Sequence, residues 1–196
     1  MISRRQTLLG IAAGGLAGGP AAALVPTPPQ TAGPFYPDVM PRESDADLVT
    51  MTGGLPAAGE VIVVEGRVLG ADGRPVPGAA LELWQANAYG RYAHGGDRSA
   101  APLDPNFQGY GAVRTDADGR YRFRTIRPGL YAGRTRHLHF YVGGPGFERR
   151  PLQMYFAGEP GNADDFLWRS LGTPERQEAV TVVFGDEGRG TFDIVL

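Results

Sequence analysis

Glycine and proline interrupt this chain every few residues, and that pattern limits its possible folds more than any other feature. The sequence holds 30 Gly and 17 Pro in 196 residues, and they separate many short apolar runs. One such run, Arg120–Ile126, alternates strictly, with Tyr121, Phe123 and Thr125 on one face and three Arg on the other. Alternation with a period of two is typical of a half-buried strand. The pattern predicts an all-β fold, a two-sheet β-sandwich with little helix.

The sequence also predicts that the chain is divided into three segments. Residues 1–25 read as an export signal, residues 26–59 as an extended Pro-rich arm and loop, and residues 60–196 as the β-sandwich domain. Residues 86–111 form a predicted loop, and a loop of that length in a compact domain is usually functional. The predicted strands are Val61–Leu69, Ala79–Gln85, Arg120–Ile126, Arg136–Val142, Leu152–Phe156, Ala179–Phe184 and Thr191–Leu196, and a short helix is predicted at Asn162–Leu171.

The first residues carry the pattern of a twin-arginine export signal. Arg4 and Arg5 follow Ser3, and a weakly apolar run rich in Gly and Ala extends to Val25. The run contains too much Gly and too little Leu and Ile to predict a membrane-spanning helix. Small residues at 21–23 are suited to cleavage. We therefore expect a periplasmic or secreted protein, against the alternative of an unstructured tail that happens to contain Arg-Arg.

Charge and cysteine content exclude several classes of function. The formal net charge is −2, and no basic block is present, so nucleic acid is not an expected partner. The chain has no Cys, which excludes disulfides and thiolate-based zinc or iron–sulfur sites. A metal ion would have to be held by His, Tyr, Asp or Glu.

Two histidines, His137 and His139, lie two residues apart in a predicted strand and therefore share one face of it. Tyr131 lies just upstream, and Tyr92 lies in the long predicted loop. Two imidazoles form half of a metal site, and two phenolates would complete a set that suits ferric iron, a hard cation. Taken alone, a His-x-His pair is also compatible with ordinary core or surface residues whose hydrogen bonds are satisfied.

Several segments together resemble one known family, the intradiol ring-cleavage dioxygenases, and among them most closely the iron-bearing chain of the protocatechuate enzymes. The resemblance runs from about Thr31 to the C-terminus. No single segment is specific, but all occur in order. They are Thr31–Pro37, Leu83–Ala88, Gly90–Tyr92, Leu103–Phe107, Thr115–Tyr121, Arg124–Gly129, His137–His139 and Gln153–Phe156.

The resemblance implies a β-sandwich enzyme that cleaves a catechol-type ring with O₂ to a cis,cis-muconate-type dicarboxylic acid. It implies that a single Fe(III) is bound by Tyr92, Tyr131, His137 and His139, with Tyr131 as the axial ligand that leaves and takes a substrate proton. Arg134 and Gln153 are implied to lie beside the substrate. The implied partners are a catecholic small molecule and O₂, with a homo-oligomer or a related subunit without iron as possible assemblies.

Some alternatives stay open from the sequence. A non-catalytic exported β-sandwich that binds a ligand would keep the same fold. Strict alternation would place Arg134 on the face opposite His137, so its implied role requires a turn or bulge within residues 132–135, where Gly133 stands. That short segment predicts an open pocket and leaves the catechol substituent undetermined. Contacts of Tyr89, His94, Arg136 and Tyr155 with a substrate are also left open.

Overall fold

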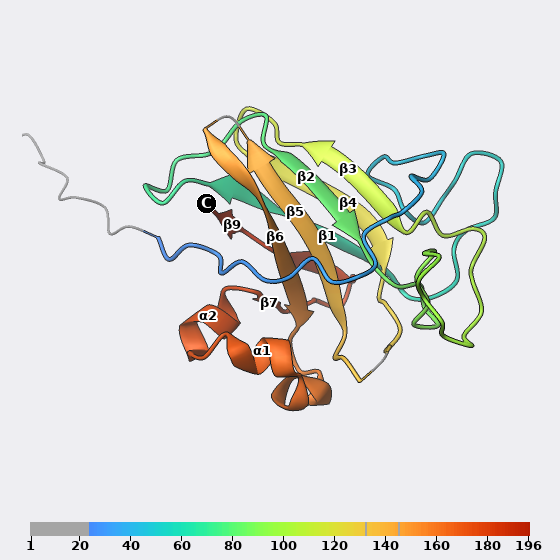
Figure 1. Cartoon of the computed structure of the whole chain (residues 1–196). Helices are drawn as coiled ribbons and strands as arrows, with labels where there is room; N and C mark the ends of the chain where they lie inside the picture. Colours follow the sequence, from blue (N-terminus) through green and yellow to red (C-terminus); the bar gives the residue numbers. More distant parts are fainter. Residues whose placement is uncertain (1–23, 132, 145) are drawn as a thin grey trace, which may run out of the picture.

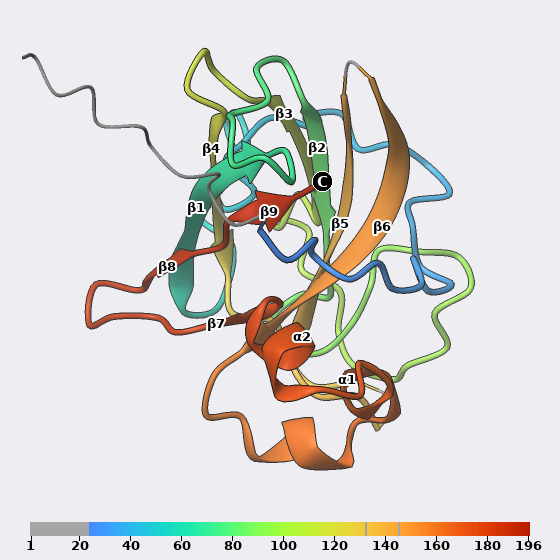
Figure 2. The ribbon, with the colours of Figure 1, turned by 90° about the vertical axis from the view of Figure 1, so that its left-hand side faces the viewer.

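A computed structural model describes residues 24–131, 133–144 and 146–196, in which two β-sheets pack face to face, as Figure 2 shows. The predicted all-β sandwich with little helix is therefore confirmed. The predicted export signal lies outside the described residues except for Leu24 and Val25. The elements are β1 Val61–Leu69, β2 Ala80–Trp84, β3 Tyr110–Arg114, β4 Arg120–Ile126, β5 His137–Gly144, β6 Phe147–Phe156, η1 Pro160–Asp164, α1 Phe166–Ser170, α2 Pro174–Glu178, β7 Thr181–Val182, β8 Arg189–Thr191 and β9 Ile194–Val195.

The two sheets have different strand orders. In the first, β1 lies between β4 and β8 and also pairs with β9; its pairing with β4 is antiparallel and its pairings with β8 and β9 are parallel. The second has the order β3-β2-β5-β6-β7. Within it, β5 pairs antiparallel with β2 on one side and with β6 on the other. Strand β5 is therefore central in its sheet, and it carries the His pair.

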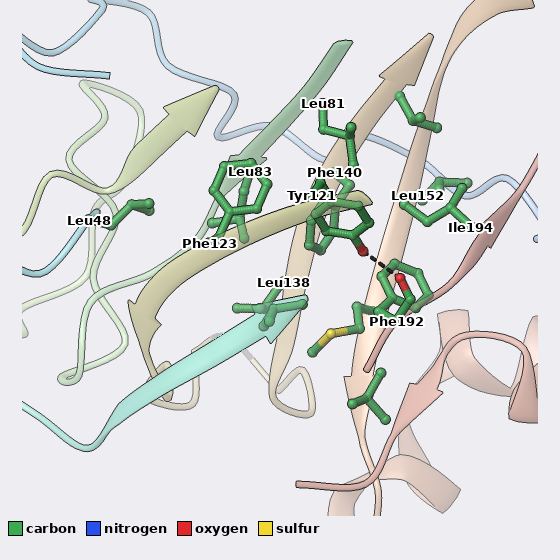
Figure 3. Close-up of a cluster of buried hydrophobic side chains, with 14 of the residues drawn as sticks. Leu48, Leu81, Leu83, Tyr121, Phe123, Leu138, Phe140, Leu152, Phe192 and Ile194 are labelled. Carbon is green, nitrogen blue, oxygen red and sulfur yellow. Dashed lines mark hydrogen bonds between the residues drawn. The ribbon is translucent and has the colours of Figure 1, made fainter. Parts of the chain in front are cut away.

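The core lies between the sheets, as Figure 3 shows. Tyr121 and Phe123 of β4 point into it, as their alternation predicts, and Leu83 of β2 and Phe140 of β5 meet them from the other sheet. Full burial of one such side chain is worth about 1.5–3 kcal/mol. The hydroxyl of Tyr121 donates to the carbonyl oxygen of Phe192 at 2.5 Å, so its one polar group is satisfied.

Residues 24–37 form an extended arm that crosses the second sheet, coloured blue in Figure 1. Thr27 exchanges hydrogen bonds with Val195, and the backbone N–H of Gln30 donates to the carbonyl of Pro151 on β6. Further along, the Tyr36 hydroxyl donates to Glu82 of β2 at 2.6 Å. These bonds tie the arm to β9, β6 and β2.

The structure differs from the sequence prediction at several elements. Strand β3 begins at Tyr110, inside the end of the predicted loop 86–111, and extends beyond it to Arg114; helix α2 is not in the prediction. The predicted helix Asn162–Leu171 is two short pieces, η1 and α1, separated by Asp165, which caps α1. In the described part of the chain, no helix has the length and apolar character needed to span a membrane.

Candidate metal centre

The His pair lies at the start of β5, between its two neighbouring strands. His137 is opposite Tyr155 of β6, and His139 is opposite Gln153 of β6 and Trp84 of β2. The two Nε2 atoms are 3.1 Å apart. His137 Nδ1 lies 2.7 Å from the carbonyl oxygen of Thr135, which orients that ring. The two imidazoles therefore present the same nitrogen toward one point.

Both tyrosines reach the same point. The hydroxyl oxygen of Tyr131 lies 3.3 Å from His137 Nε2. The rings of Tyr92 and Tyr131 are 5.1 Å apart at 85°. The backbone N–H of Tyr92 donates to Asp97 at 2.8 Å, which fixes this residue within its loop. The structure thus brings together all four residues that the sequence resemblance implies as ligands.

The hydroxyl of Tyr92 is buried and has no hydrogen-bond partner among the described residues. A buried polar group without a partner costs about 1–3 kcal/mol, so its position calls for an explanation. Among the described residues, no three His, Cys, Asp or Glu side chains gather into a metal-binding group. A metal site here would need the two tyrosines, and their oxygens suit a hard trivalent cation.

The protonation states also fit a cation site. Burial and then the nearby Arg134 lower the pKa of His137 to about 4, and burial lowers the pKa of His139 well below its usual value. Both imidazoles are therefore neutral near pH 7 and can donate a lone pair. Burial raises the pKa of Tyr92 and of Tyr131, so each is a phenol unless a cation stabilises the phenolate.

A tight turn directs Arg134 toward the His face. The backbone N–H of Arg134 donates to the carbonyl oxygen of Tyr131 at 2.9 Å, and Gly133 has φ of +72°. That conformation is open to glycine and strained for most other residues. The turn needed to place Arg134 on the same side as His137 is therefore present. It interrupts the strand-like alternation of side chains before β5.

Arg134 and Gln153 are in direct contact. Arg134 Nη2 donates to Gln153 Oε1 at 2.8 Å, and Gln153 Nε2 donates to the carbonyl oxygen of Thr31 in the arm at 2.8 Å. Tyr155 donates to the same Gln153 oxygen at 3.1 Å. Gln153 and Tyr155 lie on β6 opposite His139 and His137, and Arg134 lies just before β5, so Tyr155, which the sequence left open, belongs to the same hydrogen-bonded group.

The other three residues left open from the sequence are Arg136, His94 and Tyr89. Arg136 forms an ion pair with Glu159 at 3.0 Å. His94 lies 4.0 Å from Asp38, and Tyr89 is about half exposed. None of these three side chains forms a hydrogen bond to the four candidate ligands in the described structure.

Two features of the centre are absent from the sequence prediction. Asp165 accepts a hydrogen bond from Arg134 Nε at 2.6 Å, across 31 positions of sequence. The only sequence signal for it is its place as an N-cap before the apolar residues of α1. The second is Gly33, whose φ is +69° and whose Cβ, if it had one, would lie 3.3 Å from Cε1 of His139. The arm therefore closes one side of the centre.

The chain matches the dioxygenase family over residues 31–192, a segment that contains all four candidate ligands. It belongs to this family. It is 48% identical over 146 residues to the protocatechuate 3,4-dioxygenase beta chain of Burkholderia cepacia, a match that covers 70% of this chain and 61% of that protein. It is 34% identical over 128 residues to catechol 1,2-dioxygenase 2 of Acinetobacter lwoffii, covering 56% of this chain and 45% of that protein.

Solved structures of the family agree with the fold. The dioxygenase domain of a dioxygenase–carbohydrate-binding protein fusion from Streptomyces sp. SirexAA-E has a TM-score of 0.69 and 36% identity, covering 88% of this chain and 98% of that one. Catechol 1,2-dioxygenase from Pseudomonas arvilla C-1 has a TM-score of 0.65 and 26% identity, covering 87% of this chain and 62% of that one. The matches to the two curated relatives thus span about half to three fifths of those proteins' length.

Proposed function

We propose that this chain is an intradiol dioxygenase that cleaves a catechol-type ring with O₂ to a cis,cis-muconate-type dicarboxylic acid, using one Fe(III). The observation that carries the proposal is the buried meeting point of His137, His139, Tyr131 and Tyr92. Family membership and the protocatechuate and catechol dioxygenases among its relatives support it.

The four side chains would hold the iron through two imidazole nitrogens and two phenolate oxygens. When bound, the ion would supply the positive charge that keeps phenolate and catecholate oxygens deprotonated, and would make the bound ring reactive toward O₂. The unpartnered hydroxyl of Tyr92 and the neutral imidazoles fit this role. The protein's remaining contribution is to orient the ring and to move protons.

The two tyrosines differ in a way that assigns them different roles. Tyr92 is 3% exposed and packs within an aromatic cluster, whereas Tyr131 is only partly buried and lies beside the turn at Gly133. We assign to Tyr131 the role of proton acceptor, since its phenolate oxygen would take one catechol proton when the substrate binds. Tyr92 stays in place.

Arg134 and Gln153 would orient the ring. The guanidinium is held by Gln153, and its positive charge would stabilise negative charge that develops on the substrate. Removing one such donor typically lowers kcat by about 10²–10³-fold. We therefore expect Arg134→Ala to lower kcat while iron stays bound.

The test is oxygen uptake by the purified, iron-loaded chain with catechol, protocatechuate, hydroxyquinol and larger catechols. The proposal expects uptake with at least one of them, and a burgundy-red protein, since iron-bound phenolates absorb visible light. A colourless protein that retains no iron would instead support the alternative, an exported β-sandwich that binds a ligand without catalysis. His137→Ala serves as the matched variant that should lose both colour and uptake.

We also propose export to the periplasm or beyond, supported by the Arg4-Arg5 pattern. Replacing both residues with Lys should leave the full-length precursor in the cytoplasm. Unchanged export of that variant would reject the signal.

The assembly, whether a homo-oligomer or a pairing with a related subunit without iron, can be measured by light scattering of the exported protein.

A further inference from the structure

Asp165 is a buried carboxylate in direct contact with Arg134. Its side chain is 0% exposed, and that of Arg134 is 9% exposed. Asp165 Oδ2 accepts from Arg134 Nε at 2.6 Å and from the backbone N–H of Thr135 at 3.0 Å. Removing one partner of a buried pair leaves an uncompensated charge, so this contact is energetically significant.

The two oxygens of Asp165 differ in their short hydrogen bonds, although Arg134 Nη2 also lies 3.4 Å from Oδ1. Oδ1 accepts from the backbone N–H groups of Leu167 and Trp168, at 3.0 and 2.9 Å, and so caps α1. Oδ2 faces the segment before β5. Burial opposes ionisation, but the bonds from Arg134, Trp168 and Thr135 outweigh it and lower the pKa of Asp165. One ionised side chain therefore links α1 to the guanidinium beside the His pair.

Neither Asp165 nor Gln153 binds the third guanidinium nitrogen of Arg134, Nη1. Nε is bound by Asp165, and Nη2 is bound by Gln153 at 2.8 Å with a longer contact to Asp165 at 3.4 Å. Nη1 takes part in none of these bonds. Because a guanidinium is planar and rigid, fixing Nε and Nη2 also fixes the direction of Nη1.

We propose that Asp165 is a positioning residue of the ring-cleavage reaction, holding the Arg134 guanidinium so that Nη1 points at the bound catechol. This inference rests on the proposed function. Asp165 does not touch the substrate; it acts through Arg134. Outer partners of this kind typically contribute 10- to 100-fold to activity, because they fix the geometry of the group that does make contact.

The different roles of the two oxygens allow a selective variant. Asp165→Asn keeps an oxygen for the cap of α1, since Asn is as good an N-cap as Asp. It removes the negative charge that faces the guanidinium and turns one of the two acceptor oxygens into an N–H₂ donor; with the oxygen kept at the cap, Arg134 Nε and the Thr135 N–H lose their acceptor. Asp165→Ser is a second variant that also keeps a cap oxygen. Thr173→Ala is the matched control, because it removes the cap of the neighbouring helix α2 without touching Arg134.

Steady-state kinetics of the iron-loaded chain separate positioning from structure. We expect Asp165→Asn to lower kcat by about 10- to 100-fold with a smaller change in KM. The same substitution in an Arg134→Ala background should change kcat by less than about twofold, because the two residues act as one unit. An equal loss in both backgrounds would show a purely structural role and overturn the proposal. Thr173→Ala should leave kcat unchanged.

The NMR signal of the Arg134 Nε–H gives a readout that does not depend on catalysis. The full chain is measured with gallium(III), a diamagnetic trivalent cation, in place of iron. The wild type should show a distinct, slowly exchanging signal that Asp165→Asn and Asp165→Ser lose and Thr173→Ala keeps. An unchanged signal in the Asp165 variants would contradict the proposal. A wild type that cleaves no catechol would instead reject the proposed function, while the NMR result would still decide whether Asp165 fixes Arg134.

Discussion

The hydroxyl of Tyr92 offers the sharpest test at the scale of single residues. It is buried without a partner in the described structure, whereas the hydroxyl of Tyr121 is bonded to Phe192. Tyr92→Phe should therefore leave the thermal stability of the iron-free protein unchanged or raised, but should lower iron retention. Tyr121→Phe should lower stability by about 1 kcal/mol and keep the iron. Calorimetry and metal analysis of the two variants check this; a large loss of iron-free stability in Tyr92→Phe would contradict it.

Gly33 provides a second test at this scale. Gly33 and Gly78 have φ of +69° and +71°, so replacement by Ala strains both, by about 1–2 kcal/mol. The added Cβ at Gly33 would lie 3.3 Å from His139, whereas nothing lies within 4 Å of one at Gly78. We expect similar losses of stability in both variants but weaker iron binding only in Gly33→Ala. Equal iron affinity in the two would show that the arm does not shape the site.

The local geometry around the His pair follows from the sequence. The shared face of His137 and His139 follows from strand alternation, and the turn at Gly133 follows from the need to reverse it. Asp165 could not be found in this way, because its contact with Arg134 spans 31 positions and depends on how α1 packs. The sequence pattern that identifies Asp165 as the N-cap of α1 does not indicate that its side chain also binds a residue far away in the chain.

At the scale of elements, the arm is fixed to β2 through Glu82. This carboxylate accepts from Tyr36 at 2.6 Å and from Arg149 at 2.8 Å. Burial opposes its ionisation, but the hydrogen bonds from Arg149 and Tyr36 outweigh it and lower its pKa. A carboxylate with a lowered folded pKa contributes stability above its unfolded value of about 4.3, and the contribution is lost as pH falls through the folded value.

We therefore expect Glu82→Gln to lower the Tm near pH 7, and the difference from wild type to shrink as pH falls below about 4. Thermal melts between pH 3 and pH 7 measure it. Glu187→Gln, at a mostly exposed position beside Arg189, is the matched control and should change little. A Glu82 effect that stays constant across this range would mean that its charge does not hold the arm.

The sequence predicted most elements but not their ends. Clean alternation located β4, and turn residues bounded β1. Strand β3 is missing from the prediction, because its first two residues fall in the predicted loop 86–111 and Tyr110–Arg114 becomes a strand only by pairing with β2. Helix α2 is five residues long and depends on the cap at Thr173, too short a signal for a periodic pattern.

At the scale of the whole molecule, the apolar core lies between the sheets and does not include the four candidate ligands, so we expect the sandwich to stay folded without the metal. Removing iron with a chelator should abolish the visible colour and oxygen uptake but leave the far-ultraviolet circular dichroism unchanged. Loss of the β-sheet signal on chelation would show that the metal is needed for folding instead. Re-addition of Fe(III) should restore the colour.

Oxygen consumption in the presence of a catechol tests the central claim most directly. The purified, iron-loaded wild type is given excess O₂ and a known amount of each catechol, and the product is identified by mass spectrometry with ¹⁸O₂. The account predicts one O₂ consumed per ring cleaved and a cis,cis-muconate-type product carrying ¹⁸O, with no turnover by His137→Ala. An iron-loaded, correctly folded protein that consumes no O₂ with any catechol would contradict it.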